Sequence, residues 1–96
     1  MRREDVLAFL QAHKEELMRE FQLRRIGLFG SFARGENNEQ SDIDIVVEME
    51  EPDLFKISRL EEKLTNALGR KVDVLRLRKN MDALLRKRVE NESLYV

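Results

Sequence analysis

The chain has 96 residues, a length that fits one domain with one modest core. It has no cysteine, which excludes disulfides, thiolate metal sites and a thiol nucleophile. A formal charge of −1 argues against bulk attraction to nucleic acid or membranes, and no apolar run approaches the roughly 20 residues that span a bilayer. From this length we expect a single domain over residues 1–96. No signal-like apolar run follows the first residues, so we expect a cytoplasmic protein.

The first element is predicted to be a helix over residues 3–20. Its apolar stripe recurs at helical spacing and consists of Val6, Leu10, His13, Leu17 and Phe21. Since His13 lies on this stripe, it is interpreted as a packed or interface histidine rather than a catalytic base. Residues 25–29 form a short predicted strand, followed by a brief helical turn that ends near residue 34.

A polar loop over residues 35–41 leads into residues 43–48, whose β-branched side chains predict a strong strand. A second long helix is expected to begin at Pro52-Asp53 and to end at Gly69. Its predicted inward stripe is Leu54, Ile57, Leu60 (or Glu61), Leu64 and Leu68. Here too the spacing of apolar residues is helical.

Residues 71–77 predict a third strand and residues 81–91 a third long helix, with three inward side chains: Leu84, Leu85 and Val89. The tail 94–96 is expected to add a short edge strand. This order of elements predicts the α/β (α+β) class, with a small mixed β-sheet backed by helices around one core.

Three carboxylates fall on the predicted strands. Asp42 and Asp44 are two residues apart, so they point to the same face of a strand while Ile43 points into the core. Asp73 lies between two inward valines, and it would come within about 5 Å of the pair if its strand lies beside theirs. Adjacent carboxylates repel each other unless a cation sits between them, and Mg²⁺ prefers such oxygen ligands. These three residues are therefore candidate metal ligands and catalytic residues.

A candidate phosphate site precedes them. Gly30-Ser31 lies where a strand ends and a helical turn begins, so a phosphate could approach the backbone and meet free N–H groups and a hydroxyl. Arg34 could add a charge-assisted contact one turn later. No Gly-Lys-Ser/Thr follows, so this is not a Walker-type loop.

Together, Gly-Ser-Phe-Ala-Arg-Gly at residues 30–35 and Ser-Asp-Ile-Asp-Ile-Val-Val at 41–47 resemble the minimal nucleotidyltransferase (MNT) family. This family belongs to the DNA polymerase beta-like nucleotidyltransferase superfamily, and the resemblance covers nearly the whole chain. It implies that Gly30 and Ser31 hold the triphosphate of ATP or another nucleoside triphosphate. It also implies that Asp42 and Asp44 bind two Mg²⁺ ions, and that Asp73 binds the catalytic ion and helps to activate the acceptor hydroxyl.

The resemblance further implies a partner, a HEPN-domain toxin that the MNT protein neutralises as its antitoxin, by attaching AMP to a tyrosine. A hetero-oligomer is then expected, and direct nucleic-acid binding is not. Two alternatives remain open: a stand-alone transferase that modifies a small molecule such as an antibiotic, and a non-catalytic subunit that neutralises its partner by contact. The role of the basic run from residue 70 to residue 88 is also open.

Overall fold

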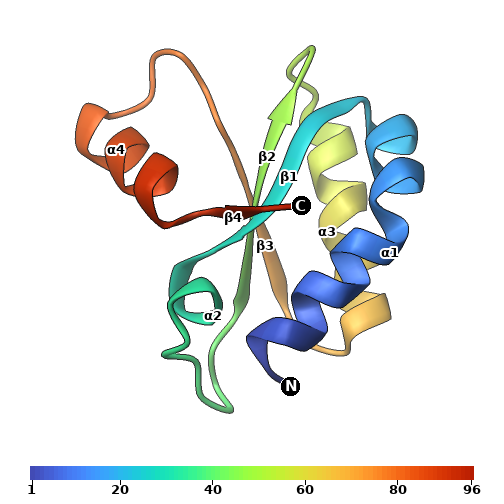
Figure 1. Ribbon diagram of the computed structural model, residues 1–96. Helices are drawn as coiled ribbons and strands as arrows, with labels where there is room; N and C mark the ends of the chain where they lie inside the picture. Colours follow the sequence, from blue (N-terminus) through green and yellow to red (C-terminus); the bar gives the residue numbers. More distant parts are fainter.

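A computed structural model describes residues 1–96 as one four-stranded sheet with helices on both faces (Figure 1). The elements follow in the order α1 (Arg3–Phe21), β1 (Leu23–Phe29), α2 (Gly30–Arg34), β2 (Ile43–Met49), α3 (Leu54–Leu68), β3 (Val72–Arg76), α4 (Ala83–Glu92) and β4 (Leu94–Tyr95). Every predicted helix and strand is present, with ends that shift by up to two residues. The predicted turn after β1 is the short helix α2.

The sheet is mixed, as predicted, with the strand order β3-β2-β1-β4. β1 runs antiparallel to both β2 and β4, whereas β2 and β3 run parallel. A parallel pair needs a crossover connection, and α3 supplies it. The register of the parallel pair places Asp44 beside Asp73, and the antiparallel register places Phe29 beside Asp44. This register sets the position of the candidate site.

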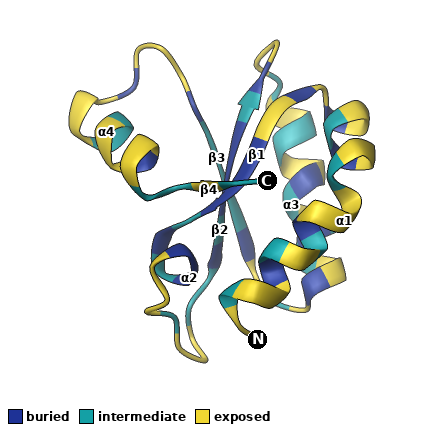
Figure 2. Ribbon diagram, viewed as in Figure 1, coloured by how far each residue is buried: buried dark blue, intermediate teal, exposed yellow.

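The main core lies between the sheet and the pair α1 and α3 (Figure 2). Ile43, Ile45 and Val47 alternate along β2 and are fully buried in it. A smaller cluster on the other face joins β2 to α4 through Val46 and Val89. The Asp53 side chain accepts hydrogen bonds from two backbone N–H groups and caps the start of α3. None of the helices is long and apolar enough to cross a membrane.

Three of the predicted helix positions are not inward. Leu54 and Leu84 are 82% and 75% exposed. Leu54 is the first residue of α3, and α4 reaches the sheet only through side chains such as Leu85 and Val89. His13 is also exposed; its ring stacks on Phe9 at a centroid distance of 4.3 Å rather than entering the core. Helical spacing identifies the apolar face of a helix. Residues at the ends and edges of that face can still lie outside the surface that packs against the sheet.

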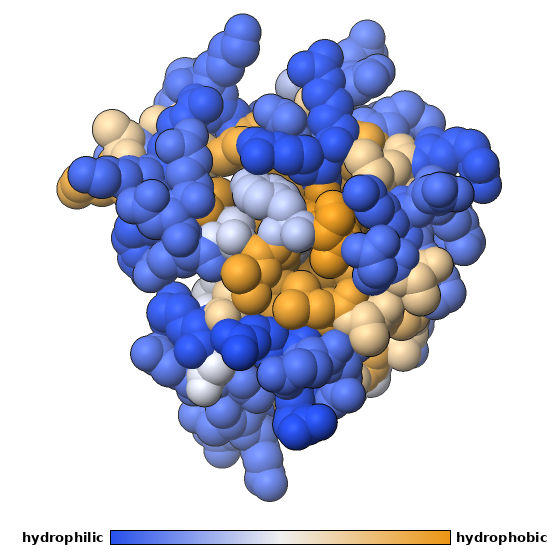
Figure 3. Space-filling model, in the orientation of Figure 1, coloured by the Kyte–Doolittle hydropathy of each residue, from blue (hydrophilic) through white to orange (hydrophobic).

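The short strand β4 closes the sheet on the β1 side. Gly27 lies opposite Tyr95, and a Cβ atom at this glycine would come within 2.9 Å of the tyrosine ring. Arg25 stacks on the same ring at 4.3 Å, so Tyr95 packs against neighbouring residues of the sheet. Apolar surface gathers around β4 between α1 and α4, and polar side chains surround it (Figure 3).

Candidate active site

The three predicted carboxylates come together at one end of the sheet. Asp42 lies immediately before β2, and Asp44 lies within it, directly beside Asp73 of β3. The neighbours Ile43 and Ile45 are fully buried on the opposite face, so strand alternation leaves the carboxylates free of the main core. The Asp42 and Asp73 side chains are 44% and 49% exposed. The prediction that Asp73 joins the pair through a neighbouring strand is confirmed.

Asp44 occupies the least favourable electrostatic position of the three. Its partial burial raises the pKa of its carboxyl group, and the negative charges of Asp73 and Asp42 raise it further, while Arg34 acts in the opposite direction. The cluster therefore holds more negative charge than the protein around it compensates.

Lys71 is a site residue that the sequence analysis did not single out. Its Nζ lies 3.9 Å from a carboxylate oxygen of Asp42 and 3.9 Å from one of Asp73. Its position two residues before Asp73, on the same side of that strand, is the signal that could have identified it. The lysine is exposed, so a cation that competes for the same oxygens can displace it into solvent.

A divalent metal is the cofactor that this donor set suggests. The side chains do not converge closely enough for three of them to enclose an ion in the present conformation. Two observations nevertheless fit a cation: all three groups supply hard oxygen atoms, and the raised pKa of Asp44 results in part from uncompensated carboxylate repulsion. Because Asp42 and Asp73 are about half exposed, their side chains can rotate to share a ligand.

Gly30 lies directly against Asp44. Its φ angle is +74°, in the left-handed region that favours glycine, and a Cβ atom at this position would overlap the Asp44 carboxylate. The half-buried Ser31 follows in the first turn of α2. The structure thus places the Gly30-Ser31 segment beside the carboxylates, as a site for both a phosphate and a metal requires.

Arg34 is held by acidic side chains at the far end of α2. Its Nε donates to Glu36 at 2.9 Å, and its Nη1 lies 3.9 Å from Glu92 at the end of α4. The hydrogen bond to Glu36 is the largest cause of a raised pKa for Arg34, so the guanidinium stays charged. A contact between Arg34 and a phosphate would have to compete with these two acids.

An apolar pocket of about 360 Å³ opens beside the carboxylates. Its lining residues are Phe29, Asp44, Asp73, Val74, Leu75 and Leu85. This pocket has no local sequence signal, because its walls come from three strands and from α4. The site therefore combines two carboxylates with a nonpolar surface that an organic group can contact.

Comparison with known proteins agrees with this geometry. Residues 10–96 match the model of the nucleotidyltransferase domain family. The chain is 44% identical to protein adenylyltransferase MntA of Thermococcus cleftensis over 94 residues, which cover 97% of this chain and 94% of the relative.

Two solved structures are also similar. One is a candidate minimal nucleotidyltransferase, with a TM-score of 0.81 and 34% identity over 98% of this chain and 95% of the other. The second is a chain from the complex of the tri-AMPylated Shewanella oneidensis HEPN toxin with MNT antitoxin, with a TM-score of 0.66 and 26% identity over 92% of this chain and 69% of the other. The present chain belongs to the nucleotidyltransferase domain family, among the MntA-like minimal nucleotidyltransferases.

Proposed function

We propose that this chain is a protein adenylyltransferase that moves AMP from ATP to a hydroxyl group of a HEPN-type partner toxin and thereby acts as its antitoxin. The observation that carries this proposal is the parallel register of Asp44 and Asp73, with Gly30 packed against Asp44. Support for the acceptor class comes from relatives: one is a protein adenylyltransferase, and another forms a complex with an AMPylated HEPN toxin.

In this proposal, Gly30 and Ser31 position the triphosphate, and Arg34 contributes positive charge nearby. Asp42, Asp44 and Asp73 would hold two Mg²⁺ ions. When bound, these ions supply positive charge to the attacking and leaving oxygens of an in-line displacement. The acceptor oxygen forms a bond to the α-phosphorus of ATP, the bond between the α-phosphorus and the bridging oxygen breaks, and pyrophosphate leaves. In this proposal, Asp73 accepts the proton of the acceptor hydroxyl.

A partner protein solves the positioning problem for a chain of this size. Phosphoryl transfer depends on geometry and charge rather than on covalent chemistry by the protein, so the acceptor has to be held close to the metal-binding oxygens. The nonpolar pocket formed by Phe29, Leu75 and Leu85 lies beside Asp73 and can contact the acceptor side chain. The partner then contributes the remaining positioning surface.

The direct test mixes the chain with its cognate helical partner, ATP and Mg²⁺, and follows both proteins by intact-mass spectrometry. We expect the partner to gain one or more AMP units and this chain to gain none. A matched reaction with Asp44→Asn should leave the partner unmodified. The proposal fails if the partner stays unmodified while a small hydroxylated molecule, such as an aminoglycoside, is modified. Neutralisation of the toxin by Asp44→Asn as well as by the unmodified sequence would instead indicate a non-catalytic binding subunit.

A further inference from the structure

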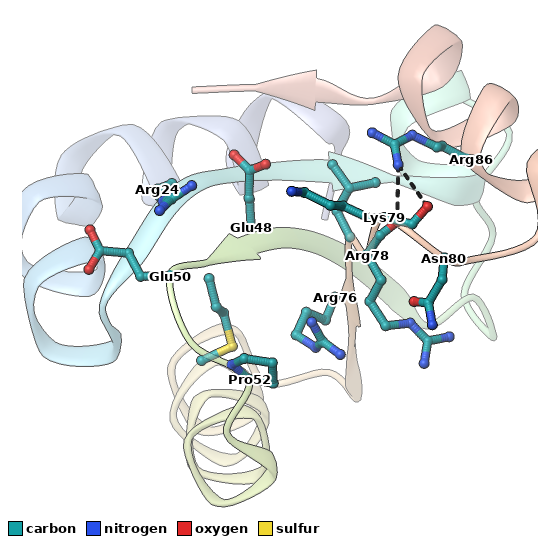
Figure 4. Close-up of a pocket in the computed structure, with 11 residues that line it drawn as sticks. Arg24, Glu48, Glu50, Pro52, Arg76, Arg78, Lys79, Asn80 and Arg86 are labelled. Carbon is teal, nitrogen blue, oxygen red and sulfur yellow. Dashed lines mark hydrogen bonds between the residues drawn. The ribbon is translucent and has the colours of Figure 1, made fainter.

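A second charged pocket lies at the opposite end of the strands from the carboxylates. It has a volume of about 520 Å³ and forms where β1, β2 and β3 meet the β3–α4 loop and α4 (Figure 4). Five cationic side chains line it: Arg24, Arg76, Arg78, Lys79 and Arg86. Glu48 at the pocket lies four residue steps along β2 from Asp44, which corresponds to about 13 Å of strand. The pocket is therefore distinct from the carboxylate site.

The positive charge in this pocket is largely uncompensated. Its two acids are Glu48 and Glu50, and Glu48 is already paired with Arg25 at 3.4 Å. Four of the five cations have no ion-pair partner within 4 Å: Arg24, Arg76, Arg78 and Lys79. Arg76 is partly buried, and burying a charged group without a partner is unfavourable. An anion bound in the pocket would supply the missing partner.

The loop that carries two of these cations is held in place before any ligand binds. Arg86 donates from Nη1 to the backbone carbonyl oxygens of Arg78 and Lys79, at 3.2 and 3.3 Å (Figure 4). At its start, the N–H of Leu77 donates to the carbonyl oxygen of Val47 at 2.8 Å. Near its end, the side chain of Met81 is buried. A binding surface whose backbone is already ordered loses less entropy when its ligand arrives.

We infer that this pocket binds the phosphate chain of a compact, multiply charged ligand, such as a polyphosphate or a nucleotide, at a site separate from the catalytic carboxylates. Guanidinium groups match phosphate oxygens with two parallel hydrogen bonds, and several phosphates are needed to balance several cations. A ligand with a single carboxylate would neutralise only one of these cations. The lining contains no aromatic side chain on which bases of a nucleic-acid strand could stack. The volume lies within the usual range for small-ligand pockets.

Titration with inorganic tripolyphosphate in a buffer containing EDTA tests this site. Without a divalent ion, the three carboxylates repel the polyphosphate, so the measured binding reports on the basic pocket. The first variant is the double substitution Arg78→Ala with Lys79→Ala, since both side chains are exposed and their removal leaves the core intact. We expect binding to weaken about tenfold or more, because each lost residue removes charge-assisted hydrogen bonds. Arg76→Gln is a second variant, and it should weaken binding in the same direction.

The matched control is Arg19→Ala with Lys87→Ala, which removes two exposed cations outside the pocket. It should bind tripolyphosphate within about twofold of the unmodified chain, as expected for screened surface charges. Melting curves without ligand verify that all variants fold. The inference is overturned if tripolyphosphate shows no saturable binding, or if the control weakens binding as much as the pocket variants. Binding of a single-stranded oligoribonucleotide without any binding of tripolyphosphate would also overturn it, because the ligand would then be a strand.

Discussion

The two ends of the strand pair β2 and β3 carry opposite charge. At one end, Asp42, Asp44 and Asp73 repel one another around a single lysine. At the other end, five arginine and lysine side chains line a pocket, and four of these five have no ion-pair partner. The formal charge of −1 for the whole chain conceals both regions. The comparison shows that the local distribution of charged side chains, rather than the net charge, identifies the candidate sites for cations and anions.

The largest expected effect comes from neutralising the acidic end. Asp42→Asn and Asp44→Asn should each lower the rate of AMP transfer by about a thousandfold or more, because each would remove a ligand of both metal ions. Asp73→Asn should lose transfer to a similar extent but keep most ATP binding, since the proposed role of Asp73 concerns mainly the attacking oxygen. Initial rates and titration calorimetry separate the two quantities. Glu39→Gln, from the exposed loop before Asp42, is the charge-matched control and should retain the rate. An equal loss in this control would mean that overall charge matters more than the three carboxylates.

A pair of glycines tests how closely the acidic end is packed. Gly30 and Gly69 both have positive φ angles, +74° and +71°, so alanine at either position should cost about 1–2 kcal/mol of stability. At Gly69 nothing lies within 4 Å of the added methyl group, whereas at Gly30 the methyl group overlaps the Asp44 carboxylate. Gly30→Ala should therefore lose additional stability and most transfer activity, while Gly69→Ala stays active. Urea unfolding and transfer rates provide the measurements. Equal losses in the two variants would show that the contact between Gly30 and Asp44 has no functional importance.

A smaller effect is expected at Ser31, in the turn that we propose binds the triphosphate. Ser31→Ala should weaken binding of Mg²⁺-ATP by about 1.5–3 kcal/mol, the usual contribution of one hydrogen bond to a charged group. Ser58→Ala, on the exposed surface of α3, is the matched control and should leave ATP affinity unchanged. Titration calorimetry measures both. Unchanged affinity in Ser31→Ala would indicate that backbone N–H groups alone hold the triphosphate.

The smallest effect concerns the stability of the metal-free protein. The folded-state pKa of Asp44 lies above its ordinary value of 3.8, so the folded state binds the proton more tightly than the unfolded state does. The free energy of unfolding therefore falls as the pH rises from about the ordinary value through the raised pKa. At neutral pH, Asp44→Asn should stabilise the metal-free protein by up to about 1 kcal/mol, a gain limited by solvent screening of a part-exposed group.

This gain should disappear well below pH 3.8, where Asp44 is protonated in both the folded and the unfolded state. Chemical unfolding at several pH values in EDTA measures it. Mg²⁺-ATP should raise the melting temperature of the unmodified chain and do so much less for Asp44→Asn, because a ligand stabilises the state that binds it. A large loss of metal-free stability in Asp44→Asn would show that the carboxylate has a structural role.

Much of the acidic end follows from local sequence rules. Period-two alternation places Asp42 and Asp44 on the face opposite Ile43, and the single aspartate in a valine-rich strand identifies Asp73. The Gly-Ser pair at a strand end indicates the turn that lies against Asp44. These features could be predicted because they depend on residues that are neighbours along the chain.

Other features depended on which surfaces meet in the folded chain. The sequence spacing treats Leu54 and Leu84 as equal to their buried neighbours, yet only the packing of α3 and α4 decides that these two remain exposed. Lys71 also reaches Asp42, and Arg34 also reaches Glu92, because segments that are distant along the chain converge there. The basic pocket draws its cations from two strands, a loop and a helix. By itself, the sequence determined the elements and the chemistry of the carboxylates; only the tertiary structure decided how charges combine, because electrostatic interactions act across space rather than along the chain.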